Sequence, residues 1–139
     1  MFFTKKRVLL FSFVGILFFY LTLLIQEKFN LFARAECGFY EPPILACFTT
    51  FVSYILLFFI PVFILNIIIY KLRDGVFLLW RKFTFIYLFI YLFIIILSPW
   101  RRDDLFPIEK STTSLFFIFL YLIIAILIII YSFFRTRNK

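Results

Sequence analysis

The sequence LFFIFLYLIIAILIIIYSFF, residues 115–134, decides the fold class of this chain. It is a run of 20 residues without a single Asp, Glu, Lys or Arg. At 1.5 Å per residue, a helix of this length reaches about 30 Å, the thickness of the hydrocarbon core of a bilayer. Arg135, Arg137 and Lys139 follow it directly. The segment therefore predicts a transmembrane helix that ends at a basic membrane surface.

Three further spans are predicted, at residues 8–25, 48–70 and 81–100. We expect the first to stay uncleaved, because its 18-residue apolar run is longer than that of a signal peptide. In the second, Pro61 removes a backbone donor and predicts a kink. Residues 26–47 and 98–114 are then outer loops, and residues 71–82 form the link on the other side.

The uninterrupted apolar run of the third span covers only residues 83–97, which is too short to cross the bilayer by itself. We expect Arg81 and Lys82 to extend to the membrane surface, and Trp80 and Trp100 to anchor the two interfaces. Residues 76–82 would form a short interfacial helix, with their apolar side chains towards the acyl chains.

The charges predict the orientation. The two termini and the link 71–82 hold ten Lys and Arg residues and one Asp, whereas the two outer loops hold five cations and six carboxylates. Short basic segments stay in the cytoplasm. The prediction is an all-α integral membrane protein, one domain built as an antiparallel four-helix transmembrane bundle, with both termini in the cytoplasm and the outer loops on the extracytoplasmic side of the plasma or inner membrane.

Composition narrows the possible functions. Apolar residues make up 65% of the chain, there is no His, and there are only two Cys residues. These numbers argue against a metal site, a cofactor site or a set of catalytic residues. The four apolar runs lack ionisable side chains, so proton-coupled transport is not supported. The net charge of +8 is divided among short segments between apolar runs, which does not favour nucleic-acid binding.

Cys37 and Cys47 both fall in the first outer loop. In an oxidising compartment such a pair is expected to form a disulfide. The alternative is a redox-active pair like those of four-helix membrane thiol oxidases, although the spacing here is not the C-x-x-C that those proteins typically show.

Small and polar residues predict where the helices pack. On the first span Ser12, Gly15 and Thr22 share one helical face. On the second, Asn66 lies at the depth at which the third span begins, so we expect it to bond to Thr84 or Tyr87, which share a face with Tyr91. The alternative for these residues is a polar pore or a quinone pocket.

We therefore expect an accessory or assembly subunit that contacts lipid and other membrane proteins and is not an enzyme. The alternative is a small oligomeric transporter or channel, or a membrane thiol-redox protein that uses Cys37 and Cys47. A homo-oligomer is compatible with either expectation.

Overall fold

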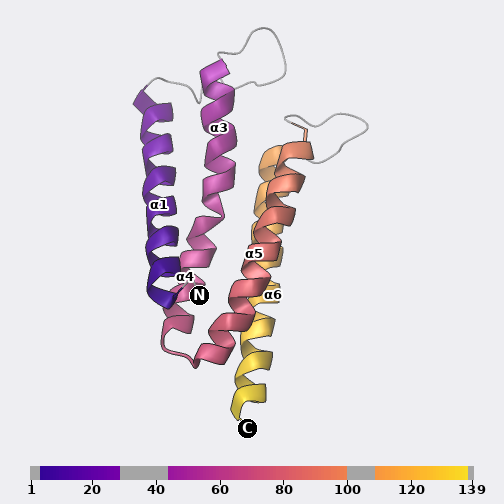
Figure 1. Ribbon diagram of the computed structural model, residues 1–139. Helices are drawn as coiled ribbons and strands as arrows, with labels where there is room; N and C mark the ends of the chain where they lie inside the picture. The colour runs from indigo at the N-terminus through magenta and orange to yellow at the C-terminus, as the bar shows by residue number, and fades with distance from the viewer. Residues whose placement is uncertain (1–3, 29–43, 100–108, 138–139) are drawn as a thin grey trace.

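The computed structural model describes residues 4–28, 44–99 and 109–137 (Figure 1). The described residues form helices and no strand. In chain order these helices are α1 (Lys5–Lys28), α3 (Ile44–Leu57), α4 (Phe59–Tyr70), α5 (Asp74–Leu97) and α6 (Lys110–Arg137).

Within the described part of the chain, four helical stretches are long and apolar enough to cross a membrane: Lys5–Lys28, Ala46–Tyr70, Asp74–Leu97 and Lys110–Arg135. The shortest of them has 24 residues, which corresponds to about 36 Å at 1.5 Å per residue and exceeds the hydrocarbon core. The predicted all-helical fold with four apolar helices is confirmed. Such a set of helices indicates a multi-pass membrane protein.

The second stretch consists of two helices, α3 and α4, separated at Phe58. Pro61 has no N–H to offer the carbonyl of Leu57, so the regular hydrogen-bond ladder cannot continue through this turn. The Phe58 N–H donates instead to the carbonyl of Ile55, three residues earlier, at 3.4 Å. The sequence predicts a kink at Pro61, and the structure places the interruption about one turn before it.

The third stretch begins earlier than the sequence predicts. α5 runs from Asp74 to Leu97 as one helix, so the prediction of a separate interfacial helix over residues 76–82 is wrong. Val76, Phe77 and Trp80 are buried within the protein instead of facing acyl chains. Packing of this first part of α5 against the other helices keeps it in line with the rest of the span.

The helices are arranged as two antiparallel pairs (Figure 1). α1 packs along the α3–α4 span, and α5 packs along α6. Smaller contacts of α3 and α4 with α5, and of α4 with α6, join the two pairs. The start of α1, the turn between α4 and α5, and the end of α6 lie at one end of the molecule (Figure 1).

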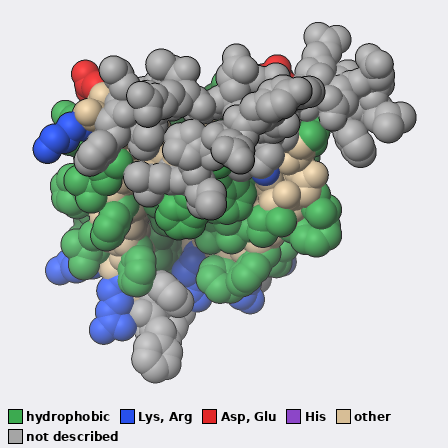
Figure 2. Space-filling view, turned by 90° about the horizontal axis from the view of Figure 1, so that it is seen from above, with side chains coloured by type: hydrophobic (Ala, Val, Ile, Leu, Met, Phe, Trp, Pro, Cys, Tyr) green, Lys and Arg blue, Asp and Glu red, His purple; other side chains and the backbone are tan. Residues whose placement is uncertain are grey.

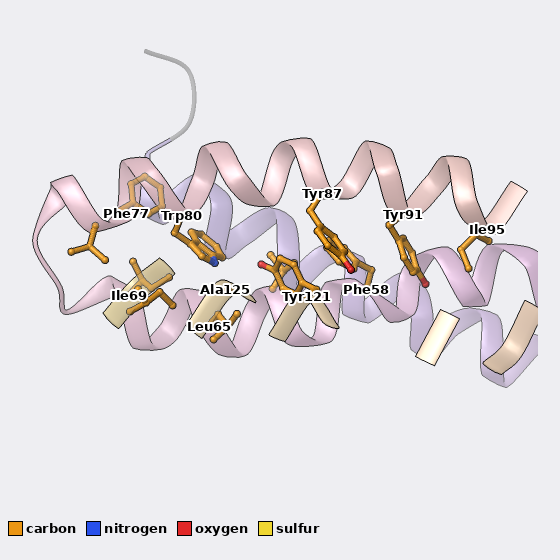
Figure 3. Close-up of a cluster of buried hydrophobic side chains, with 13 residues drawn as sticks. Phe58, Leu65, Ile69, Phe77, Trp80, Tyr87, Tyr91, Ile95, Tyr121 and Ala125 are labelled. Atoms are coloured by element: carbon orange, nitrogen blue, oxygen red, sulfur yellow. The ribbon is translucent and has the colours of Figure 1, made fainter. Parts of the chain in front are cut away.

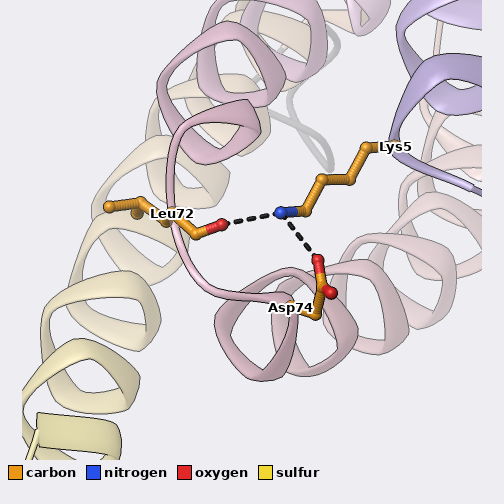
Figure 4. A network of polar contacts seen from close by, with 3 residues as sticks. All are labelled: Lys5, Leu72 and Asp74. Atoms are coloured by element: carbon orange, nitrogen blue, oxygen red, sulfur yellow. Dashed lines mark hydrogen bonds and ion pairs between the residues drawn. The ribbon is translucent and has the colours of Figure 1, made fainter.

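Lys5 connects the start of α1 to the turn between α4 and α5 (Figure 4). Its Nζ donates to the carbonyl of Leu72 at 2.6 Å and lies 2.8 Å from Oδ1 of Asp74. The Asp74 carboxylate also sits in the first turn of α5, where the helix dipole favours a negative charge. The Asp74 side chain is 88% exposed, so the ion pair fixes geometry more than it adds stability.

Candidate functional site

One face of α1 carries its buried residues, which are Ser12, Gly15 and Gln26. A Cβ atom built on Gly15 would lie 2.4 Å from Cγ of Phe59 and within 2.8 Å of both Cδ atoms of that ring. The missing side chain therefore lets α1 approach α4 as closely as it does. The Ser12 hydroxyl donates within its own helix, to the carbonyls of Val8 and Leu9 at 2.9 and 3.0 Å.

Two side-chain hydrogen bonds join the same face of α1 to α3. The Ser53 hydroxyl donates to Oγ1 of Thr22 at 3.1 Å, and Nε2 of Gln26 donates to Oγ1 of Thr50 at 3.3 Å. The structure thus places the predicted packing residues of the first span against α3 and α4.

Four aromatic rings fill the space where the two helix pairs meet (Figure 3). The ring centroid of Phe58, at the α3–α4 junction, lies 4.8 Å from that of Tyr121, 5.0 Å from that of Tyr91 and 6.1 Å from that of Tyr87. Phe58, Tyr91 and Tyr121 are at most 1% exposed. Ring pairs at these distances add to the free energy of packing beyond the burial of area. We call these four residues the aromatic cluster.

Each hydroxyl of the aromatic cluster has a partner inside the bundle. Tyr91 donates to the carbonyl of Tyr54 at 2.6 Å, which leaves its oxygen to accept from Ser114 at 2.7 Å. These two bonds connect α5 with both α3 and α6.

The other two hydroxyls bond between α5 and α6. Tyr87 donates to the carbonyl of Phe117 at 2.8 Å, and the hydroxyls of Tyr121 and Thr84 are 2.9 Å apart. Thr84, Tyr87 and Tyr91 therefore lie on a face of α5 that packs against other helices, as residues at these spacings should.

The prediction that Asn66 bonds to Thr84 or Tyr87 is wrong. Asn66 is fully buried, but neither atom of its side-chain amide has a hydrogen-bond partner among the described residues. The hydroxyls of Thr84 and Tyr87 are directed to α6. Similar depth in the membrane did not bring the predicted partners to facing sides of their helices.

Sequence reasoning missed the residues of α6 that complete this centre. Ser114, Tyr121 and Ala125 are fully buried, and Ser132 is 3% exposed. They are separated by seven, four and seven residues, which places them on one helical face. Small and hydroxyl side chains at this spacing in an Ile- and Phe-rich run were the signal that could have identified them.

The predicted interfacial anchors have different surroundings. Trp80 is fully buried, and its indole N–H has no partner among the described residues, so it is part of the core and not an exposed anchor. The guanidinium carbon of Arg81 lies 5.6 Å from the centre of the Phe77 ring. Lys82 is exposed, and Trp100 lies outside the described residues.

A groove with a volume of about 690 Å³ runs between α1 and α5, and α4 contributes to its wall. Val8, Phe11 and Ser12 line it from α1, and Phe59 and Val62 from α4. α5 contributes residues between Trp80 and Leu88, which include Arg81 and Lys82. We call this feature the α1–α5 groove.

The described outer surface is otherwise dominated by large apolar side chains. Figure 2 shows hydrophobic side chains over most of the coloured surface in that view. Outward residues of three spans, such as Phe11, Phe93 and Phe119, are more than 60% exposed. A bilayer solvates such a surface, whereas water does not.

The remaining sequence predictions concern cysteines and metals. Cys47 lies in α3, but Cys37 is outside the described residues, so the Cys37–Cys47 disulfide stays a prediction. Within the described ranges, no group of three His, Cys, Asp or Glu residues is placed to hold a metal ion.

The chain matches no known family, no curated protein and no solved structure. The described centre joins helices through packed rings and paired hydroxyls, and the groove and the outer faces of the spans remain as surfaces that could bind other molecules.

Proposed function

We propose that this protein is an accessory or assembly subunit that binds another membrane protein through the outer face of α1.

The orientation we propose has both termini in the cytoplasm. The described cations support it, because nine of them belong to the end formed by the start of α1, the α4–α5 turn with the first turns of α5, and the end of α6: Lys5, Lys6, Arg7, Lys71, Arg73, Arg81, Lys82, Arg135 and Arg137.

The interior of the bundle is filled by packed side chains. The aromatic cluster occupies the place where the two helix pairs meet, and its hydroxyls are bonded internally. A transported solute would need groups there that bind and release it. A role exerted through the outer surface fits these side chains better than transport through the bundle.

The proposal rests on the exposed position of Tyr20 near the middle of α1. This residue is 60% exposed and lies on α1 away from the buried residues Ser12, Gly15 and Gln26. Charged residues at both ends of α1, up to Arg7 and from Glu27, place its centre near residue 17. The Cα of Tyr20 is then about 5 Å from the middle of the span, in a hydrocarbon core that extends about 15 Å to either side.

A phenol hydroxyl at this depth needs a hydrogen-bond partner that acyl chains cannot supply. A donor or acceptor on a helix of a neighbouring protein would satisfy it, and such contacts give membrane helices their specificity. We therefore assign the partner-binding surface to the side of α1 that carries Tyr20, together with Leu17 and Leu24 one turn away on either side.

Photo-crosslinking in native membranes tests this assignment. A benzophenone amino acid at position 20 should form an adduct with another protein chain. The same group at Phe18, an exposed residue that points about 160° away on the helix, should react mainly with lipid. Lipid adducts alone at both positions would contradict the proposal, and an adduct with a second copy of this chain would favour the homo-oligomer.

A matched pair of variants measures the contribution of the hydroxyl. Tyr20→Phe removes one oxygen and should reduce recovery of the crosslinked partner in mild detergent by about 3- to 20-fold, as expected for one interhelical polar contact. Tyr131→Phe is the control, because this exposed residue lies only four positions before Arg135, where water and headgroups can satisfy a hydroxyl. Equal recovery for both variants would argue against Tyr20 as a contact.

A further inference from the structure

The α1–α5 groove has the dimensions of a binding site for one lipid chain. Along α5 its lining extends from Trp80 to Leu88, a rise of about 12 Å at 1.5 Å per residue. One leaflet of the hydrocarbon core is about 15 Å deep. The volume of about 690 Å³ also falls within the usual range of small-molecule sites.

The interior of the groove offers an apolar surface. Phe59, Val62 and Leu88 line it, and the two hydroxyls along it are already bonded. Ser12 donates to carbonyls of its own helix, and Thr84 pairs with Tyr121 on α6. A hydrocarbon chain in the groove therefore leaves both of these hydroxyls satisfied.

The lips of the groove are apolar and outward-facing. Phe11 on α1 is 63% exposed, and Phe85 and Ile86 on α5 are 54% and 61% exposed. In a bilayer these side chains would face acyl chains, so an occupant can enter sideways from the lipid phase.

One end of the groove is cationic. Arg81 and Lys82 line it, and none of the described lining residues is acidic. In the orientation proposed above, this end lies at the cytoplasmic surface of the membrane. Basic pockets between membrane helices at that surface bind anionic lipid headgroups.

We propose that the α1–α5 groove binds one anionic glycerophospholipid. Its phosphate lies against Arg81 and Lys82, and one acyl chain follows the groove towards the middle of the bilayer. The order of charge and apolar surface along the groove matches the order of headgroup and chain in a lipid. Tyr20 does not line this groove, so the lipid site is separate from the proposed partner-binding surface.

Native mass spectrometry of the purified full chain in mild detergent tests the proposal. Phosphatidylglycerol and phosphatidylcholine with identical acyl chains are added in turn, and the fraction of protein that retains one lipid is measured. Phosphatidylglycerol should be retained preferentially. Glycerol phosphate, which lacks acyl chains, should not compete with it, because the groove contributes to the affinity.

Charge variants identify the site. Arg81→Gln with Lys82→Gln should weaken phosphatidylglycerol binding about 30-fold, or about fivefold for each cation. Lys82→Gln alone removes an exposed charge, leaves the core untouched and should give the fivefold effect. Lys71→Gln with Arg135→Gln is the matched control; it removes two exposed cations at the same end of the molecule that do not line the groove and should leave binding unchanged.

Three results would overturn the proposal. They are equal retention of the two lipids, unchanged binding in the Arg81 and Lys82 variants, and a photo-crosslink from position 85 to another protein in place of lipid. The last result would assign the groove to a partner helix.

Discussion

Replacing Gly15 with Ala tests the packing of α1 against α4. The added Cβ would lie 2.4 Å from Cγ of Phe59, whereas ordinary contacts begin at 3.4 Å, so the ring or the helix must retreat by about 1 Å. Rotation of the ring about its own axis leaves Cγ in place and cannot relieve the clash. The two helices must therefore move apart, or Phe59 must adopt another rotamer.

The expected magnitude follows from two opposing terms. Overpacking costs about 1–3 kcal/mol, and Ala is about 1 kcal/mol better than Gly in a helix. Gly15→Ala should therefore lower the free energy of unfolding by about 1 kcal/mol, the difference between these two terms. Gly15→Leu adds more atoms at the same contact and should cost about 2 kcal/mol or more.

A double-mutant cycle with Phe59→Ala isolates this contact. That change removes the atoms that the new Cβ would meet, so Gly15→Ala should become neutral or stabilising in its presence, with a coupling energy of about 1–3 kcal/mol. Unfolding by increasing SDS in mixed micelles, followed by helical circular dichroism, gives the four free energies.

The control is Leu17→Phe, which adds bulk to an exposed position of α1 and should change little. The close approach of α1 to α4 would be refuted if Gly15→Ala left the free energy of unfolding unchanged both in the wild type and in the Phe59→Ala variant.

Three further predictions use the same unfolding assay or a chemical probe. Tyr91→Phe removes a hydroxyl that connects three helices and should cost about 0.6–1.7 kcal/mol, whereas Tyr131→Phe at an exposed position should cost little; equal effects would contradict the hydroxyl network. Asn66→Leu removes a buried amide without a described partner and should stabilise the protein by about 1 kcal/mol; a loss of stability would show that the amide does have a partner. Cys37 and Cys47 should resist alkylation until reduced, and replacing both with Ser should cost about 3 kcal/mol; alkylation without reductant would contradict the disulfide.

Hydropathy and spacing were sufficient to predict the four spans and the contact face of α1. For an apolar run as long as residues 115–134, length and backbone hydrogen bonding both predict a helix that crosses the bilayer. Small residues are scarce in α1, so Ser12 and Gly15 stand out among bulky neighbours. A close helix approach requires small residues, which makes this kind of contact readable from sequence.

The beginning of α5 and the partners of Asn66 were not predictable in the same way. Arg81 and Lys82 interrupt the apolar run, yet Arg81 packs over Phe77 and the helix continues through both residues. The bonding of Thr84 to α6 depends on the rotation of each helix about its axis. Hydropathy fixes depth along a span but does not fix that rotation.

We propose that four membrane-crossing helices place both ends of the chain on the cytoplasmic side. Dual reporters that are active on opposite sides of the membrane, fused in separate experiments after Lys139 and within residues 100–108, test it directly. We predict that the reporter at Lys139 is active in the cytoplasm and that the one within residues 100–108 is active outside. A reporter after Lys139 that is active only outside would mean an odd number of crossings or an inverted protein, and would contradict the proposed topology.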